Sequence, residues 1–253
     1  MKILLQKNIW QEYAYDRFLQ SIKDHPHIDF EEVEVIPFTH NFVPEIDYVP
    51  DYVFGSTRFV HICRSRGFPV FPGFAGIEEF YPKELYVNGN SKVVRWGDVV
   101  INSPTFIKPM YVEKFFTGRV FENQDDLNKA QLSTSFIENE NDVLVLLSEP
   151  VSIKTEVRFF IIGGKISSGS IYKTGESNGY ELLTNAHSSG AWKSAQDILD
   201  SHGAICSGFV MDLGWDGENW KIVELNCIQS SGLYANDTDA IVSDIYSLWA
   251  NKV

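Results

Sequence analysis

The most constraining feature of the sequence is a pair of apolar segments at 207–226 that carry acidic side chains in their middle. Asp212 lies in the first segment, Glu224 and Asn226 lie in the second, and the turn between the segments reads WDGEN. Glu224 and Asn226 are two residues apart, so in a strand they project from the same face. Two carboxylates and a carboxamide are hard oxygen ligands of the kind that Mg²⁺ prefers. The segment therefore predicts a metal site with Asp212, Glu224 and Asn226 as ligands.

The strand register sets a condition for this site. A two-residue turn at 216–217 would pair Asp212 with Lys221 and leave Glu224 on the opposite face of the sheet. We therefore expect the hairpin to have an odd loop or a β-bulge. The alternative is that these polar residues face water from an edge strand, as alternating strands often do.

The whole chain predicts two units that mix helices and strands. Its 253 residues are 44% hydrophobic and 22% charged, which is enough apolar material for one large core or two smaller ones. Short apolar runs around a helical spacing predict a small α/β domain over 1–90, and strand pairs separated by helices predict a mostly antiparallel α+β domain over 91–253. The helices predicted for the second domain cover 124–139, 190–201 and 237–251.

Charge and cysteine content argue against several classes of protein. Lys and Arg total 21 against 34 for Asp and Glu, so the net charge of −13 would repel a polyanion and we expect no nucleic-acid partner. No stretch approaches the roughly 18 uninterrupted apolar residues of a membrane span, and we expect a cytoplasmic protein without membrane contact. Cys63, Cys206 and Cys227 are odd in number and lack C-x-x-C spacing, which argues against a disulfide framework and a structural zinc site.

The segment TEVRFFIIGGKI carries a second signal. Glu156 and Arg158 share one face of the predicted strand, and Gly163-Gly164 is the predicted hairpin turn. Arginine suits phosphate because its planar fork donates two parallel hydrogen bonds. The alternative is a solvated ion pair on an exposed strand. Just upstream, Glu149 in SEP ends an apolar strand, where a carboxylate could meet a nucleobase, although a Glu before a Pro is also ordinary loop chemistry.

The segment FIKPMYVEKFFTGRVF carries the third signal. Lys108 ends one predicted strand, Lys114 starts the next, and Thr117-Gly118 follows where a hairpin could bend over a ligand. Two cations and a glycine loop are typical of phosphate binding. Lys108 is flanked by apolar residues, and a lysine in an apolar strand needs a partner.

Signatures of other catalytic classes are absent from the sequence. It contains no G-x-S-x-G elbow, no H-E-x-x-H, no kinase H-R-D or D-F-G, no G-x-G-x-x-G and no Walker A loop. Apart from His25 and His27, the six histidines are scattered singly, so a histidine-based metal site is not expected.

Taken in order, FIKP, KFFTGRVF, SEP, E-V-R and the D followed by E-L-N resemble the ATP-grasp superfamily. The close pair Lys108 and Lys114 with Arg158, followed by ELNCIQSSGLY, is similar to the ATP-grasp clade named for one arginine and two lysines, which occurs in bacteria and their phages. The resemblance covers roughly 91–253. It implies an ATP-grasp fold, in which two α+β subdomains sandwich ATP, and 1–90 would be the small α/β domain that precedes it.

The resemblance also implies a role for each matching residue. Lys108 and Lys114 would lie near the α- and β-phosphates, and the hairpin at Thr117 and Gly118 would fold over them. Glu149 would hold adenine, and Val151 would wall the ring. The remaining matches are Glu156 on the nucleotide side, Arg158 as the phosphate-binding arginine, Lys173 facing the acyl phosphate or the substrate, and Asp212, Glu224 and Asn226 as magnesium ligands.

Two departures from the family pattern concern the loops. Cys227 follows Asn226 where a proline often stands, and the segment between Lys114 and Glu149 is short.

The activity that the resemblance implies is an ATP-dependent carboxylate–amine ligase. It would form an amide or peptide bond through an acyl phosphate, release ADP and phosphate, and use ATP and two Mg²⁺ ions as cofactors. Small-molecule or peptide carboxylates and amines would be its substrates. Two alternatives stay open: a phosphotransferase that acts on a small molecule, and a non-catalytic nucleotide-binding module, for which a lost metal carboxylate is expected.

The sequence gives weaker signals for the binding site of the acceptor substrate than for that of the nucleotide. Residues 174–190 are polar and glycine-rich, which predicts a substrate loop. Ser230 and Ser231 follow the predicted metal strand and could hold a substrate carboxylate. Arg64 and Arg66 are candidates for binding the charge of the acid, and the alternative for both is a solvated helix face.

Overall fold

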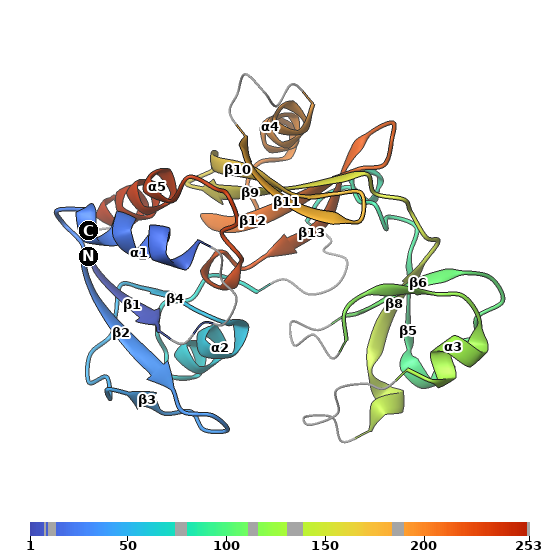
Figure 1. Ribbon diagram of the computed structural model, residues 1–253, viewed down its shortest axis with the longest axis horizontal. Coiled ribbons are helices and arrows are strands. Elements are labelled where there is room, and N and C mark those ends of the chain that lie inside the picture. Colours follow the sequence, from blue (N-terminus) through green and yellow to red (C-terminus); the bar gives the residue numbers. More distant parts are fainter. Residues whose placement is uncertain are drawn as a thin grey trace.

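Three β-sheets organise the part of the chain that the structure describes, and each sheet takes its strands from one stretch of sequence (Figure 1). The computed structural model describes residues 1–7, 9, 14–73, 80–110, 116–130, 139–183 and 190–251. None of the helices in these ranges has the length and apolar character needed to cross a bilayer.

The first sheet is built around a parallel pair of strands, which a crossing helix makes possible. Residues 2–6, KILLQ, supply its central strand and are buried over almost their whole length. Ser56 begins the second helix of this unit by accepting a hydrogen bond from the backbone N–H of Phe59. Its elements are β1 (Lys2–Gln6), α1 (Tyr15–Asp24), β2 (Asp29–Val35), β3 (Phe42–Val43), β4 (Tyr52–Phe54) and α2 (Thr57–Ser65), with strand order β3-β2-β1-β4.

The second sheet is antiparallel and lies in a lobe of its own, at the right of Figure 1. Ile107, Phe121 and Val145 are fully buried in its core. Because Ile107 faces this core, the next residue, Lys108, points to the opposite face of the sheet. The elements are β5 (Lys92–Arg95), β6 (Thr105–Pro109), β7 (Arg119–Phe121), α3 (Gln124–Asn128) and β8 (Leu144–Ser148), with strand order β5-β8-β6-β7.

The third sheet is the largest and connects the other parts of the molecule. Gly163 and Gly164 have φ angles of +59° and +80°, which allows the tight turn between its first two strands, as the sequence predicts. The elements are β9 (Thr155–Ile162), β10 (Lys165–Thr174), β11 (Ser177–Leu183), α4 (Ala191–His202), β12 (Gly208–Trp215), β13 (Trp220–Asn226) and α5 (Thr238–Ala250), with strand order β11-β10-β9-β12-β13.

The two faces of the third sheet are covered by different elements (Figure 1). Helix α4 covers one face, where Phe159 and Met211 lie in an apolar core. On the other face, Phe160 and Val210 pack with Phe18 of α1 and with α5, so the first unit shares a core with the third sheet. This second face carries polar residues beyond the shared core, and we call it the site face.

A β-bulge between β12 and β13 satisfies the condition that the sequence sets. Gly214 pairs with Lys221, whereas Asp212 pairs with Glu224, so Val223 is the extra residue. The bulge places the acidic candidates of both strands on the site face, as predicted. It also turns Lys221 to the site face, although Lys221 lies three residues before Glu224 and would otherwise point away.

Two sequence predictions need correction or limits. The predicted loop over 174–190 is wrong for 177–183, which form the edge strand β11, whose mostly exposed side chains give it the composition of a loop. The helix predicted over 124–139 is shorter, because α3 ends at Asn128 and 131–138 lie outside the described residues. The helices predicted near 190–201 and 237–251 are confirmed by α4 and α5.

Gly169 in β10 generates a prediction about packing. A Cβ at this position would lie 2.6 Å from the ring of Phe159, and overpacking of a core costs about 1–3 kcal/mol. We expect Gly169→Ala to lower the free energy of unfolding, measured by urea denaturation, by about 2 kcal/mol. Gly179→Ala in β11 is the matched control, because a Cβ there meets nothing within 4 Å. Equal stability of the two variants would contradict this packing.

Candidate active site

A row of three charged side chains crosses the site face from β9 to β13. Arg158, Asp212 and Glu224 are neighbours in register on adjacent strands. Arg158 donates from Nε to Asp212 Oδ1 at 2.8 Å and from Nη2 to Asp212 Oδ2 at 2.7 Å. Asp212 is 0% exposed and Arg158 is 7% exposed, so this is a buried, two-pronged ion pair.

Asn226 connects the two carboxylates of the row. Its Nδ2 donates to Asp212 Oδ2 at 3.2 Å and to Glu224 Oε1 at 3.0 Å. Glu224 Oε1 also lies 4.0 Å from Arg158 Nη2, and the Glu224 side chain is 29% exposed. The structure therefore brings the three predicted metal ligands together, with one carboxylate fully buried and the other open to solvent.

The electrostatics of the buried pair favour the charged forms at neutral pH. Burial raises the pKa of the Asp212 carboxyl to about 6, and the charge and hydrogen bonds of Arg158 act in the opposite direction. Burial alone would lower the pKa of Arg158, but the charge and hydrogen bonds of Asp212 outweigh it and raise that pKa above its ordinary value. The ion pair is therefore intact near pH 7.

Glu156 lies two residues before Arg158 on β9 and binds two side chains of the neighbouring strand β10. It accepts hydrogen bonds from Tyr172 Oη at 2.7 Å and from Lys173 Nζ at 2.8 Å. Burial, followed by the charges of Asp212 and Glu156, raises the pKa of the Tyr172 hydroxyl far above its ordinary range, so this hydroxyl stays a donor. Arg158 and Lys173, the two predicted catalytic residues, are thus each held by a carboxylate on the site face.

Aromatic rings cover the arginine. The Arg158 Cζ atom lies 4.9 Å from the ring centroid of Tyr234 and 5.4 Å from that of Tyr172, and the two rings stack at 4.9 Å. Arg158 Nη1 also donates to the Gly232 carbonyl at 3.2 Å. Tyr234 has a φ angle of +48°, and its carbonyl accepts from Arg17 Nη2 at 2.5 Å. The sequence does not predict that these rings pack on Arg158, because no motif links a loop tyrosine to a strand arginine.

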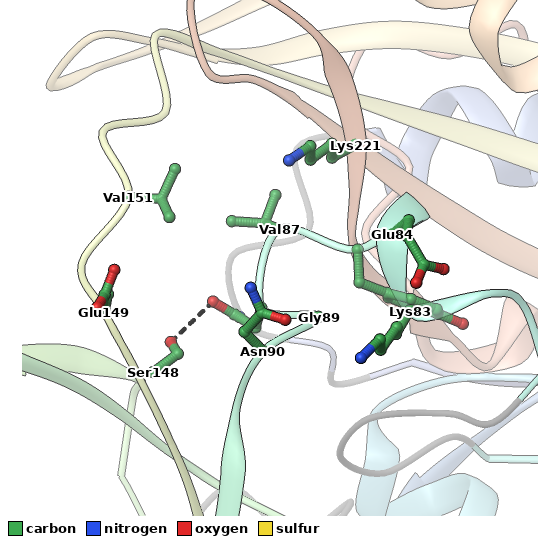
Figure 2. Close-up of a pocket in the computed structure, with 11 residues that line it drawn as sticks. Lys83, Glu84, Val87, Gly89, Asn90, Ser148, Glu149, Val151 and Lys221 are labelled. Carbon is green, nitrogen blue, oxygen red and sulfur yellow. Dashed lines mark hydrogen bonds between the residues drawn. The ribbon is translucent and has the colours of Figure 1, made fainter.

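A cavity of about 490 Å³ is lined in part by Lys221, near the start of β13. Figure 2 shows Val87 and Val151 on opposite sides of it, Lys221 above them, and Glu149 on the side of Val151. Glu149 and Val151, the residues predicted to hold adenine, therefore both line it. The cavity has the size of a small-molecule site. The lining also includes Lys83, Glu84, Tyr86, Asn88, Gly89, Asn90 and Ser148.

A larger cavity lies at the other end of the third sheet. It has a volume of about 700 Å³ and is lined mainly by apolar side chains, among them Tyr52, Ile162 and Trp249. Its acidic lining residue, Asp51, already accepts a hydrogen bond from the backbone N–H of Lys2 at 2.6 Å. The smaller cavity is the better candidate, because its lining residue Lys221 and the row residue Glu224 lie on the same strand and the same face.

The predicted phosphate-binding segment is described in part. Gly118 lies against Lys108, since a Cβ at position 118 would be 2.8 Å from the Lys108 Cβ. The hairpin therefore approaches the lysine as closely as a glycine allows, and Thr117 beside it is exposed. Lys114 lies outside the described residues.

The predicted substrate residues have other partners. Arg64 Nη2 donates to the Phe71 carbonyl at 2.9 Å, and Arg66 Nη2 donates to the His40 carbonyl at 2.5 Å. Ser231 is buried and donates to the Cys227 carbonyl at 2.8 Å, and Ser230 ends the short 3₁₀ helix Ile228–Ser230. Among the contacts of the described residues, none joins the two arginines to the carboxylate row, so their role stays a prediction.

Comparison with known proteins identifies the family. A family model described as the ATP-grasp domain, R2K clade family 2, matches residues 91–243. The chain belongs to this ATP-grasp family. The match confirms the resemblance to the clade that the sequence motifs indicate. Among curated proteins, no sequence matches this chain.

Solved structures share the ATP-grasp fold over nearly the full chain. A RimK domain ATP-grasp protein from Sphaerobacter thermophilus is 10% identical, with 99% of this chain and 98% of that chain covered and a TM-score of 0.59. D-alanine–D-alanine ligase from Bacillus anthracis is also 10% identical, with 100% and 98% covered and a TM-score of 0.59. The ATP-grasp ligase PsnB, solved with a minimal precursor, is 12% identical, with 98% of each chain covered and a TM-score of 0.52. These matches confirm the predicted fold.

The donor chemistry at the row of this ATP-grasp chain fits a magnesium ion. Within the described ranges, no group of three or more His, Cys, Asp or Glu side chains is placed to hold a metal ion, so a site here needs the carboxamide as well. The amide nitrogen of Asn226 lies within 3.2 Å of an oxygen of each carboxylate, and the oxygen of the same amide would be the third hard ligand. Both oxygen atoms of Asp212 accept hydrogen bonds from Arg158, so Glu224 is the more accessible of the two carboxylate ligands.

The buried ion pair of the ATP-grasp site generates a stability prediction. Arg158→Met should lower the free energy of unfolding by about 3–5 kcal/mol, because it leaves a buried carboxylate without its cation. Urea denaturation of Arg158→Met, Asp212→Asn and the double variant measures this coupling, and the double variant should lose less than the sum of the single losses.

The exposed pair Lys193–Asp197 supplies the control. Its side chains are 72% and 59% exposed, and such pairs contribute about 1 kcal/mol or less. An Arg158→Met variant no less stable than Lys193→Met would contradict the assignment of a buried, coupled pair.

Proposed function

We propose that this chain is an ATP- and magnesium-dependent carboxylate–amine ligase. In this proposal, residues 91–253 form the ATP-grasp domain and residues 1–90 form the small α/β domain before it. One observation carries the proposal: Lys221, which lines the cavity of about 490 Å³, pairs with Gly214 at the same-face position next to the Asp212–Glu224 pair of the row. A nucleotide with its base in the cavity would therefore bring its phosphates to the row.

Different residues around the cavity and the row would bind different parts of the nucleotide. Val87 and Val151 would hold the flat base between apolar walls, and Glu149 would accept a hydrogen bond from it. Lys108 and Lys114 would bind the phosphates under the hairpin at Thr117 and Gly118, which in part lies against Lys108. Glu156 would keep Lys173 in place at the substrate side of the nucleotide.

The row is the proposed magnesium site. Asp212, Glu224 and Asn226 would hold Mg²⁺, two ions in all, which when bound neutralise charge on the reacting phosphates. Arg158 is held by Asp212 and by the Gly232 carbonyl, and its remaining N–H groups would donate to the terminal phosphate.

The reaction needs positioned charges rather than a nucleophile from the protein. The substrate carboxylate attacks the γ-phosphorus, the bond to the β–γ bridging oxygen breaks, and ADP leaves. The amine then attacks the acyl carbon, inorganic phosphate leaves with the electron pair of the C–O bond, and the amine loses a proton. Lys173 would stabilise the acyl phosphate, and Ser230 and Ser231 would hold the acid.

The family and the fold support this reaction class. The similar structures include D-alanine–D-alanine ligase and the ATP-grasp ligase PsnB, which was solved in complex with a minimal precursor. We infer from them that small-molecule or peptide carboxylates and amines are the substrates.

Replacement of the accessible carboxylate tests the metal site. We expect Glu224→Gln to lower kcat for ADP release by at least about 100-fold, because one lost charge-neutralising contact typically costs this much. Glu218→Gln, on the turn between β12 and β13, is the matched control and should keep wild-type turnover. A Glu224→Gln variant with normal turnover would refute the metal assignment.

Hydroxylamine distinguishes the ligase from the phosphotransferase. With ATP, Mg²⁺ and a pool of carboxylic acids, hydroxylamine should trap the acyl phosphate as a hydroxamate, together with stoichiometric ADP. A phosphorylated alcohol without hydroxamate, or AMP with pyrophosphate, would contradict the ligase. Mass spectrometry identifies all of these products.

A further inference from the structure

Lys221 is a cation of the site face that the sequence motifs do not assign. Because Val223 bulges out of the strand, Lys221 pairs with Gly214 on the same face as Glu224. Its side chain lines the cavity of about 490 Å³, and Figure 2 shows its ammonium directed over Val87 towards the side of Val151 and Glu149. The lysine therefore faces the place where the base would lie, one step away from the carboxylate row.

The turn between β12 and β13 restrains this ammonium. Asp216 Oδ1 accepts from the backbone N–H groups of Glu218 at 2.8 Å and Asn219 at 2.7 Å. These hydrogen bonds lower the pKa of Asp216 and fix its carboxylate. The other oxygen, Oδ2, lies 3.8 Å from Lys221 Nζ. The Asp216 carboxylate is thus anchored by the turn itself and holds the lysine at the edge of the cavity.

The cavity combines complementary groups around two apolar walls. Val87 and Val151 can enclose a flat ring, the Glu149 carboxylate can only accept hydrogen bonds when ionised, and the Lys221 ammonium can only donate them. A ring with an amino group on one edge and an unprotonated nitrogen on another satisfies both. Adenine has this pattern. Guanine also carries an amino group and unprotonated ring nitrogens, but in the orientation that adenine takes it would present a carbonyl oxygen to the Glu149 carboxylate, without a proton between them.

We propose that Lys221 binds the base of the nucleotide and favours adenine over guanine, by donating to a ring nitrogen while Glu149 accepts from the exocyclic amino group. This inference rests on the proposed function, because it takes the cavity to be the nucleoside site. It adds a residue and a basis for nucleotide specificity to that site. The phosphates are left to Lys108, Lys114 and Arg158.

Calorimetric titration of Lys221→Met with three ligands tests the assignment. Adenosine, ADP and a non-hydrolysable ATP analogue with Mg²⁺ carry the same base and different numbers of phosphates. We expect the dissociation constant to rise by about 10- to 100-fold for each ligand, and by the same factor, since one charged hydrogen bond to the base is lost. Lys221→Arg, which keeps the charge and donors, should lose less affinity.

Lys165→Met is the matched control, because it removes an equal charge from an exposed position at the start of β10. It should leave all three constants unchanged, and melting curves of both variants check their folding. The wild type should also bind the ATP analogue more tightly than the corresponding GTP analogue, and Lys221→Met should reduce that preference.

Three results would overturn the assignment. A loss that grows with the number of phosphates would place Lys221 on the phosphate chain. A loss no larger than that of Lys165→Met would remove it from the site, as would an unchanged preference for adenine in Lys221→Met. A wild-type protein that binds none of the three ligands would instead refute the proposed function as a whole, which separates the two failures.

Discussion

The buried ion pair between Arg158 and Asp212 is the interaction on which the site face depends. Asp212 is fully buried on an inner strand of a five-stranded sheet, where an unpaired carboxylate would be very costly. Two hydrogen bonds from one guanidinium remove most of that cost, and they also fix the arginine beside Glu224. The sheet can therefore keep carboxylate oxygens next to an apolar core, as the proposed magnesium site requires.

One extra residue in β13, Val223, places Glu224 and Lys221 on the same face of the sheet as this ion pair. The bulge at Val223 keeps Asp212 and Glu224 opposite each other and turns Lys221 to the same face. A Cβ at Gly214 would lie 2.8 Å from Val223 and 2.9 Å from Ile153, so the glycine lets both side chains pack directly over β12. The proposed base and metal sites are thus both connected to β13, through Lys221 and Glu224.

The sequence predicts the parts of this arrangement that follow from short-range geometry. The two-residue alternation of strands puts Glu224 and Asn226 on one face, and the length of the turn predicts that an odd loop or a bulge is needed to add Asp212. The partner of Asp212 is 54 residues away in the sequence, so no spacing rule reveals it. The sequence does not reveal Lys221 for a related reason. Lys221 lies three residues before Glu224, and in a regular strand this spacing would place the two side chains on opposite faces. The edge strand β11 has the polar composition of a loop, and only its pairing with β10 makes it a strand.

A crystal structure with a non-hydrolysable ATP analogue and Mn²⁺ tests the central claim most directly, since Mn²⁺ can be located by its anomalous scattering. The account predicts the base between Val87 and Val151, and an ion within about 2.3 Å of oxygen atoms of Glu224, Asn226 and Asp212. A nucleotide bound in the cavity beside Trp249, or an ion held away from these three side chains, would contradict it.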